Sequence, residues 1–365
     1  MKHYGIISFE IGVHKNYENV RSAHIQIPVE LTKKLQNFGD KVHFFTNQLR
    51  HDTKLPKELE ETNIVTIPDP RKRNAKTVMY SGFSKKIDLI NIIKGIYSII
   101  KFSKQNELDV LHFMNGSISV GIYASITAIF STRAKVFWTP STTLKNHYGI
   151  TKYLFSFLDG MISHTDYHRL HNSKLFKDVK TIKHGISRNI KLTSSNKKRV
   201  TFWRDPSYEN GADIAKVVFE NLANEFPEII FTFMIRPYFD EIDVNSEFKN
   251  IEVFKFPYQN DITLENILSE SIVCVFPFRE FSTNPQLSIL ESLQIGIPCV
   301  CSDIESASEY GIDEKLLIKN HNIKDYESAI KMVLKDPQNF IPQKPDSIGF
   351  TWDNYLSKHM ELYNQ

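Results

Sequence analysis

The chain has 365 residues, of which 41% are hydrophobic and 24% charged, and its formal net charge at pH 7 is +3. This composition is typical of a folded protein, and the length exceeds that of a usual single domain, so we expect two domains. The small net charge argues against a dedicated nucleic-acid binder.

The three cysteines, Cys274, Cys299 and Cys301, all fall in apolar runs and show no CxxC or Cys/His metal spacing. This pattern argues against a structural zinc site and favours a reducing compartment. The N-terminus lacks the long apolar segment of a signal peptide, and no apolar run reaches transmembrane length. A cytoplasmic location is therefore expected.

Strands and helices alternate through the first half of the chain. YGIISFE predicts a first strand, a helix with apolar Ile27, Leu31 and Leu35 follows and ends at Gly39, and KVHFFTN predicts the second strand. Further strands are predicted at IVTIP, LDVLHFM, AKVFWTP, DGMISHT and TIKHG, with no two-strand hairpin signal. This alternation predicts a parallel sheet in a doubly wound α/β domain, and the first loop carries no GxGxxG dinucleotide fingerprint.

Two residues of this half are candidate catalytic groups because they fall at the carboxyl ends of predicted strands. Glu10 follows the first strand, and His112 lies in LDVLHFM. Ligands of open α/β sheets bind beyond the carboxyl ends of the strands. The alternative is that the side chains are hydrogen-bonded parts of the structure, as loop histidines often are.

Residues 85–104 predict an amphipathic, basic helix in which lysines alternate with isoleucines at three- and four-residue spacing. One interpretation is a helix on an anionic membrane surface, which would make a peripheral contact at the inner face of the membrane. The other is an ordinary crossover helix with a lysine-rich solvent face. The apolar stripe favours the second interpretation, because any crossover helix needs one.

A polar linker, ISRNIKLTSSNKKR, precedes a second α/β pattern. Its first strand, VTFW, ends at Arg204, the next ends at Arg236, and the chain closes with an amphipathic helix in residues 346–365. The predicted domains are residues 1–187 and residues 188–345, followed by this helix.

The stretch from Cys274 to Tyr310 predicts a strand, a polar loop, a helix and a second strand. The helix begins near Leu287 and is stopped by Gly296 and Pro298. The polar groups before and on this helix are Arg279, Glu280, Asn284, Gln286 and Glu291. Such a loop between buried strands predicts a ligand site, with a solvated loop and salt bridge as the alternative.

The order strand, Arg204, loop, Gly211 and helix, followed by NPQLSILESLQIGIPCV, resembles the family 4 glycosyltransferases. The segment SILESLQIGIPCVCSDIESASE is similar to the second half of that family's E-G-F-G-x-x-x-x-E-A-M-A-x-G-x-P-V-V motif. The resemblance implies the GT-B fold, in which two Rossmann-like domains face each other across a cleft and a C-terminal helix returns to the N-terminal domain. It assigns the acceptor to the N-terminal domain and the nucleotide-sugar donor to the C-terminal one.

By this resemblance Glu291 accepts hydrogen bonds from the ribose hydroxyls, and Arg204 contacts the donor diphosphate. The chemistry is reasonable, because a guanidinium or a helix N-terminus stabilises the charge that a leaving nucleoside diphosphate develops. The alternatives are that Arg204 pairs with Asp205 or Glu209, and that Glu291 is a surface carboxylate.

The chain departs from the family pattern at several positions. Thr283 stands where the family has its first glutamate, and Glu280 is the candidate that fills this place, as a third catalytic group beside Glu10 and His112. Asn210 replaces the phosphate-binding lysine. The predicted donor-binding residues are Arg204, Arg236, Arg279, Asn284, Gln286, Leu287 and Glu291, with no metal ligand.

The sequence thus predicts a hexosyl- or deoxyhexosyltransferase that uses a UDP-, GDP- or dTDP-linked donor and a glycan or lipid-linked acceptor. Cell-surface polysaccharide or glycoconjugate synthesis is the expected setting. The resemblance implies retention of anomeric configuration, and the lack of an Asp-x-Asp motif fits catalysis without a metal or other cofactor. The alternatives are a sugar-nucleotide epimerase of the same fold and a non-catalytic glycan-binding or scaffold subunit.

Overall fold

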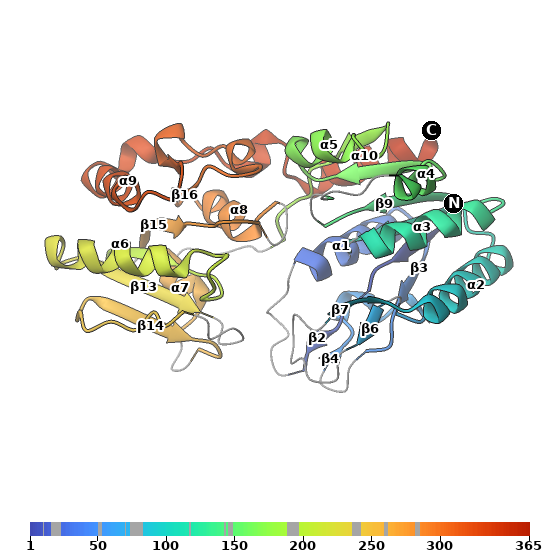
Figure 1. Ribbon diagram of the computed structural model, residues 1–365, viewed down its shortest axis with the longest axis horizontal. Coiled ribbons are helices and arrows are strands. Elements are labelled where there is room, and N and C mark those ends of the chain that lie inside the picture. Colours follow the sequence, from blue (N-terminus) through green and yellow to red (C-terminus); the bar gives the residue numbers. More distant parts are fainter. Residues whose placement is uncertain are drawn as a thin grey trace. The chain divides into compact units, whose positions relative to one another are not determined.

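The structure, a computed structural model, describes residues 1–9, 11–15, 23–49, 53–69, 71–73, 83–116, 118–141, 144, 149–187, 197–235, 242–258, 262–281 and 285–365. The chain divides into two compact units (Figure 1). Unit 1 comprises Met1–Gly185 and Trp352–Gln365, and unit 2 comprises Ile186–Thr351. The domain boundaries predicted from the sequence lie after residues 187 and 345.

Unit 1 is built on a seven-stranded sheet with the order β11-β10-β9-β8-β1-β3-β5. Every described strand pair in it is parallel. The strands are β1 (His3–Ile7), β3 (Lys41–Thr46), β5 (Asn63–Thr66), β8 (Val110–Met114), β9 (Lys135–Thr139), β10 (Gly160–Ser163) and β11 (Val179–Thr181). The parallel sheet predicted for this half of the chain is confirmed.

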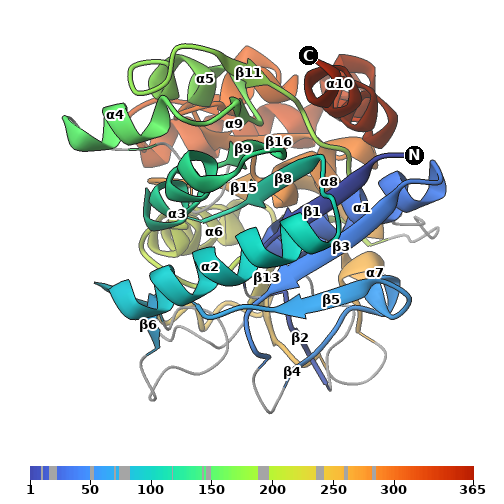
Figure 2. The same ribbon diagram turned by 90° about the vertical axis from the view of Figure 1, so that its right-hand side faces the viewer.

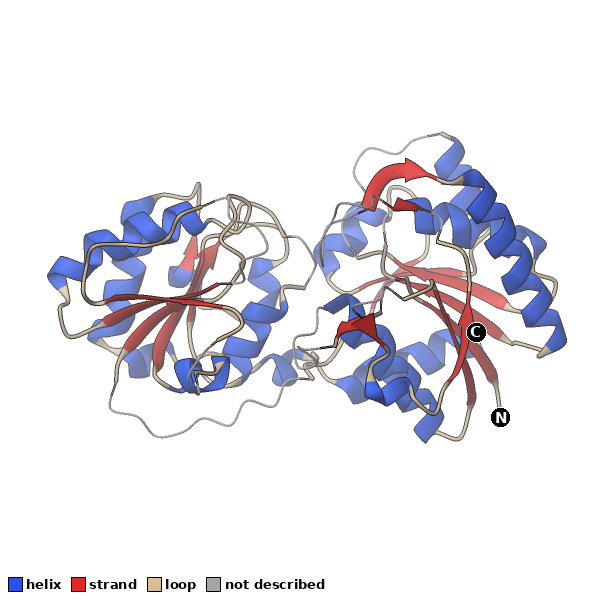
Figure 3. Cartoon of the chain, turned by 90° about the horizontal axis from the view of Figure 1, so that it is seen from below, coloured by secondary structure: helices blue, strands red, loops and turns tan. Residues whose placement is uncertain are grey.

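Helices cover both faces of this sheet (Figure 3). They are α1 (Ala23–Asn37), α2 (Leu89–Gln105), α3 (Ile118–Phe130), α4 (Ile150–Phe155), α5 (Asp166–Asn172) and α10 (Trp352–Asn364), with a short 3-10 helix at Lys57–Leu59. Glycine ends α1 as predicted, because Gly39 adopts a φ of +84° that other residues rarely take.

Two predictions in unit 1 are wrong. The helix expected over residues 85–104 begins only at Leu89, where the Asp88 side chain caps it by accepting a hydrogen bond from the backbone N–H of Asn91 at 3.1 Å. Lys85 and Lys86 belong instead to β7 (Phe83–Ile87), which pairs antiparallel with β6 (Arg71–Arg73). A second antiparallel ribbon joins β2 (Val13–His14) to β4 (Thr53–Lys54), although no hairpin was expected.

The C-terminal helix returns to unit 1, as predicted. The ring of Tyr363 on α10 lies 5.5 Å from that of Tyr4 and 5.2 Å from that of Phe137. Lys34 on α1 forms an ion pair with Asp353 at 2.9 Å. The last helix therefore packs on residues from the opposite end of the sequence.

Unit 2 repeats the architecture with a six-stranded parallel sheet of order β14-β13-β12-β15-β16-β17. The strands are β12 (Arg199–Phe202), β13 (Ile230–Ile235), β14 (Ile251–Lys255), β15 (Ser271–Phe276), β16 (Cys299–Ser302) and β17 (Leu317–Ile318). The helices are α6 (Ala212–Glu225), α7 (Leu264–Ser269), α8 (Leu287–Gln294) and α9 (Ile323–Lys335), with 3-10 turns at Ala307–Tyr310, Glu314–Leu316, Pro337–Phe340 and Pro345–Ile348.

The centre of this second sheet is strongly apolar. Strands β15 and β16 are paired so that Cys274 lies beside Cys299, and Cys301 is on the same strand as Cys299. All three cysteines are free and fully buried, as the sequence predicted for core residues. The two units together confirm the predicted α/β class with two Rossmann-like sheets.

Candidate functional site

The five predicted donor residues that the structure describes lie at the carboxyl edge of the unit 2 sheet. Strands β12 and β15 are parallel neighbours in the middle of this sheet, so their carboxyl ends meet at the same edge. Arg204 follows β12, and Arg279 and Glu280 follow β15. Helix α8, which carries Leu287 and Glu291, connects β15 to β16 and begins at this edge. This is where ligands of open α/β sheets bind.

A glycine brings the loop after β12 against the end of β15. Gly211 is the N-cap residue of α6 and has a φ of +70°. A Cβ atom at this position would lie 1.9 Å from the carbonyl oxygen of Pro277, so no other residue fits without a shift of the backbone. The loop is fastened further by the backbone N–H of Arg279, which donates to the carbonyl of Glu209 at 2.8 Å.

Arg204 and its neighbour Trp203 connect β12 to the rest of the edge. The guanidinium carbon of Arg204 lies 5.7 Å from the centre of the Phe278 ring, within the range of a cation–π contact. The indole N–H of Trp203 donates to the hydroxyl of Ser292 on α8 at 3.2 Å. The end of β12 and the helix are thereby held together.

The N-terminus of α8 has no side-chain cap among the described residues. Gln286 is its N-cap residue, yet its side chain makes no capping hydrogen bond, and its own backbone N–H donates to the hydroxyl of Tyr310 at 3.2 Å. Tyr310 also pairs with the hydroxyl of Ser306 at 2.7 Å, and burial raises its pKa. The backbone N–H groups of a first helical turn have no partner within the helix, so they can bind an anion.

Two polar side chains at this helix end are buried without a hydrogen bond. Both polar atoms of the Gln286 side chain, which is 0% exposed, lack a partner among the described residues, and so does the hydroxyl of Ser288, which is 2% exposed. Glu291, 4% exposed, follows Ser288 by three residues and Leu287 by four, so the three side chains share one face of the helix. Buried polar atoms in folded proteins nearly always have a partner.

Arg279 is engaged within the protein. Its two terminal nitrogens donate to the two carboxylate oxygens of Asp213, each at 2.7 Å, and its guanidinium lies 3.6 Å from the centre of the Tyr208 ring. Burial acts to raise the pKa of Asp213, but the hydrogen bond and charge of Arg279 outweigh it and lower that pKa. The same hydrogen bond raises the pKa of Arg279. Glu280, the next residue, is exposed.

The structure places His112 in the core of unit 1. Its ring nitrogens pair with the hydroxyls of Tyr363 on α10, at 2.6 Å, and of Thr139 on β9, at 2.8 Å. Burial, followed by the nearby His359 and His164, lowers the pKa of His112 well below its usual value. A fully buried histidine with both nitrogens occupied connects two strands to the last helix.

His112 belongs to a wider group of buried rings. The Nδ1 atoms of His164, His184 and His359 pair with backbone carbonyl oxygens at 3.0, 2.8 and 2.8 Å. Burial lowers the pKa of both His184 and His359 to about 4, and that of His164 well below its usual value. We call these four residues the histidine cluster.

Three further predicted residues, Glu10, Arg236 and Asn284, lie outside the part of the chain that the structure describes. Their roles stay predictions.

The sequence did not single out Asp213, Tyr310 or His321 as site residues. His321 follows β17 at the same sheet edge, and it and Asn320 have φ values of +53° and +55°. Burial and the nearby Arg279 lower its pKa, against the opposing effect of Asp213. The polar run NHN after the strand LLIK was the available signal, since such a backbone at a strand end is common in functional loops.

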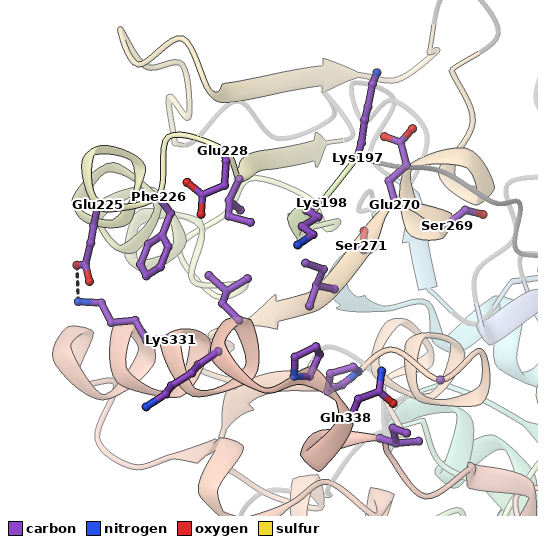
Figure 4. Close-up of a pocket in the computed structure, with 18 residues that line it drawn as sticks. Lys197, Lys198, Glu225, Phe226, Glu228, Ser269, Glu270, Ser271, Lys331 and Gln338 are labelled. Carbon is purple, nitrogen blue, oxygen red and sulfur yellow. Dashed lines mark ion pairs between the residues drawn. The ribbon is translucent and has the colours of Figure 1, made fainter.

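A cavity of about 1050 Å³ lies at the other edge of the unit 2 sheet (Figure 4). Its walls include Lys198 before β12, Ser271 at the start of β15, Pro298 before β16, and the ion pair of Lys331 with Glu225 at 2.5 Å. No predicted site residue lines it. It opens at the amino ends of the strands, where open α/β sheets do not bind their ligands.

The described residues contain neither a metal-binding cluster nor a helix that could span a membrane. No group of three or more His, Cys, Asp or Glu side chains in the described ranges is placed to hold a metal ion. Among the described helices, none has the length and apolar character needed to cross a membrane.

Comparisons with known proteins agree with this geometry. Residues 185–347, almost the whole of unit 2, match the family model described as glycosyl transferases group 1. A search of curated proteins finds no match.

Solved structures extend the likeness to the whole chain. Sucrose-phosphate synthase from Thermosynechococcus elongatus aligns with a TM-score of 0.72 at 13% identity, covering 100% of this chain and 99% of that one. A glycosyltransferase from Rickettsia africae ESF-5 gives 0.69 at 13% identity, with 100% and 98% covered. HepE from Anabaena, in complex with UDP and glucose, gives 0.68 at 12% identity, with 100% of both chains covered. Residues 185–347 thus match the glycosyl transferases group 1 family, and the chain as a whole has the GT-B fold of these solved glycosyltransferases.

Proposed function

We propose that the chain transfers a sugar from a nucleoside diphosphate donor, which binds at the carboxyl edge of the unit 2 sheet against the N-terminus of α8. The observation that carries the proposal is the pair of buried side chains Gln286 and Ser288 at this helix end, which have no hydrogen-bond partner among the residues that the structure describes. Leaving such groups unsatisfied costs about 1–3 kcal/mol each, and a bound ligand would remove that cost.

Three sets of groups would each bind a part of the donor. The first-turn amides of α8 would hold the diphosphate, with Arg204 supplying a positive charge from the neighbouring strand end. Glu291, one turn along the helix, would accept hydrogen bonds from the ribose hydroxyls. The side chains of Gln286 and Ser288 would together bind either the diphosphate or the sugar.

The reaction follows from these positions. The bond between the anomeric carbon and the diphosphate oxygen breaks, a bond from the acceptor oxygen to the same carbon forms, and the acceptor proton passes to the departing diphosphate. The helix N-terminus and Arg204 stabilise the charge that develops on the leaving group. Retention of configuration, and transfer without a metal, are the outcomes we expect from the family resemblance. Glu280, exposed at the same edge, remains the proposed carboxylate near the sugar.

The other predicted groups are less well supported. The contacts of His112 favour a structural role over the predicted catalytic one, since both nitrogens already have partners. Those of Arg279 favour a role in fastening the loop of Asp213. We propose a glycan or a lipid-linked molecule as acceptor, in the synthesis of a cell-surface polysaccharide or glycoconjugate.

The test is thermal stabilisation by nucleoside diphosphates. UDP is the first candidate because it is bound in the HepE structure, and GDP, ADP and dTDP complete the set. At a ligand concentration about a hundredfold above Kd, we expect Tm to rise by about 5–10 °C. The variants Glu291→Ala and Arg204→Ala should abolish the rise.

Glu314→Ala, an exposed carboxylate elsewhere in unit 2, is the matched control and should leave the rise intact. The proposal fails if none of the four nucleotides stabilises the wild-type chain. With the best nucleotide known, its sugar derivatives can be compared for hydrolysis and transfer.

A further inference from the structure

Helix α3 presents an unusually apolar surface on unit 1. Its sequence, ISVGIYASITAIF, contains no charged residue. Ile118, Ile122 and Ile126 are only partly buried, and Ile129 and Phe130 at its end are exposed. These isoleucines repeat every three or four residues, so they share one side of the helix. Ile118, Ile122 and Ile126 also pack against the core of unit 1, and the exposed apolar area of α3 lies at its end.

The helices on either side of α3 extend this surface. Figure 2 shows α2, α3 and α4 side by side, and α3 contacts both of the others. On α2, Leu89, Ile90, Ile93 and Tyr97 are between 65% and 70% exposed. On and after α4, the exposed apolar residues are Ile150, Tyr153 and Phe157. We call the exposed side chains of the three helices the α2–α4 face.

Most of the largest exposed apolar side chains of the described chain lie on this face. Elsewhere such residues are scattered singly, as Phe38 on α1 and Ile341 in unit 2 are. Soluble proteins rarely expose several large apolar side chains together unless a partner or a membrane covers them. The α2–α4 face therefore needs an occupant.

The charged side chains on the three helices are all of one sign. Neither α2, α3 nor α4 contains an aspartate or a glutamate. Exposed lysines lie on α2 and α4, namely Lys94, Lys101, Lys104 and Lys152. The acidic residues closest in sequence already have partners in the fold: Asp88 caps α2, Glu107 forms an ion pair with Arg133 at 3.5 Å, and Asp159 accepts from the backbone N–H of Val136 at 2.7 Å.

This charge pattern decides between the possible occupants. A second copy of the chain would bring lysines against lysines, with no acidic residue on the three helices to pair them. A bilayer with anionic headgroups offers an apolar layer for the leucine, isoleucine and phenylalanine side chains and negative charges for the lysines. The tyrosines suit the boundary between the two layers.

We propose that the α2–α4 face is a peripheral docking surface for an anionic lipid membrane. Helices α2, α3 and α4 lie on the surface, with Ile90, Ile93 and Tyr97 entering the headgroup layer and Lys94 and Lys101 contacting lipid phosphates. The contact is independent of which donor unit 2 binds. It places the surface on α2, α3, α4 and Phe157, whereas the sequence had indicated residues 85–104.

The experiment is co-sedimentation of the purified full chain with lipid vesicles. We expect binding to phosphatidylcholine vesicles that contain about 30 mol% phosphatidylglycerol and little binding to phosphatidylcholine alone. The double variant Ile90→Ser/Ile93→Ser should lower the vesicle affinity roughly tenfold or more. Lys94→Glu/Lys101→Glu should do the same and remove most of its dependence on salt.

Matched controls come from α1, on another part of unit 1. Phe38→Ser removes an apolar side chain that is as exposed as Leu89, and Lys33→Glu reverses an exposed lysine. Both should bind vesicles like the wild type, and an unchanged Tm shows that each variant is folded. All substituted side chains are exposed, so we expect no loss of folding.

Three results would overturn the proposal. One is a wild-type chain that does not sediment with the anionic vesicles. Another is binding that the serine and glutamate variants leave unchanged. The last is a dimer in light scattering that Ile90→Ser/Ile93→Ser dissociates, which would assign the face to contact between copies of the chain.

Discussion

Both units place polar side chains near the carboxyl ends of parallel strands, but the hydrogen bonding of these side chains differs between the units. In unit 1, His112 has both ring nitrogens paired, with Thr139 and Tyr363. In unit 2, neither polar atom of the Gln286 side chain has a partner among the described residues. Both side chains are 0% exposed. A polar residue near a strand end is therefore weak evidence for a site until its own bonding is known.

The largest expected difference between the units is their response to acid. Burial lowers the pKa of all four residues of the histidine cluster, to about 4 for His184 and His359, whereas a histidine in an unfolded chain titrates near 6.5. As the pH falls from 6.5 to 4, the unfolded state takes up protons that the folded state does not. The stability of unit 1 is fully present above pH 6.5 and should fall by several kcal/mol across this range.

Unit 2 contains a single histidine of the 13 in the chain, His321, and should resist this change. Hydrogen exchange measured by mass spectrometry at pH 7.5 and 5.0 can follow α10 and α8 separately, once corrected for the intrinsic exchange rate. We expect α10 to lose protection and α8 to keep it. An equal loss in both helices would erase the proposed difference.

The next largest effect is expected for His112→Ala. The substitution leaves the buried hydroxyls of Tyr363 and Thr139 without this partner and opens a cavity, so it should cost about 3 kcal/mol of the free energy of unfolding. Urea denaturation measures this loss, with His171→Ala on α5 as the control. If His112 acted instead as a catalytic group, the variant would keep its stability and lose only transfer activity.

Gln286→Leu should behave in the opposite way. Replacing a buried amide that has no partner among the described residues by an apolar group of similar size should leave the stability of the free protein unchanged or raise it by about 1–3 kcal/mol. Nucleotide affinity should fall about tenfold, because the ligand loses its partner. The control is Gln294→Leu at the other end of α8, where the amide donates to Asp346 at 3.0 Å. Full nucleotide affinity in Gln286→Leu would remove Gln286 from the site.

The smallest effect is expected at the pair of Arg279 and Asp213. The two side chains are 21% and 36% exposed, so breaking the pair by Arg279→Ala or Asp213→Ala should cost only about 0.5–1 kcal/mol. Both variants should bind nucleotide within about threefold of the wild type if the arginine only fastens the loop. A large loss in Arg279→Ala alone would instead support its predicted role in phosphate binding.

The fold was predictable because alternating apolar runs and helical spacing are local signals. The predicted start of α2 was wrong because the residues KKI can either continue a helix or belong to a strand. The strand with which they pair, β6, is too distant in the sequence to affect a helical pattern. The place of the proposed donor site was suggested by a local signal, a strand end followed by a polar loop. The hydrogen-bond partners of the candidate residues could not be predicted, because they are far away in the sequence. Tyr363 is 251 residues from His112, and Asp213 is 66 residues from Arg279.

The position of the three cysteines has a practical consequence. Cys274, Cys299 and Cys301 lie on neighbouring strands of unit 2, none is exposed, and unit 1 contains none. Burial raises the pKa of each thiol, to about 12 for Cys274. A thiol reagent can therefore modify the native chain only when the centre of the unit 2 sheet opens. The rate of modification reports the opening of that sheet alone, so the native sequence already contains a probe of one half of the molecule.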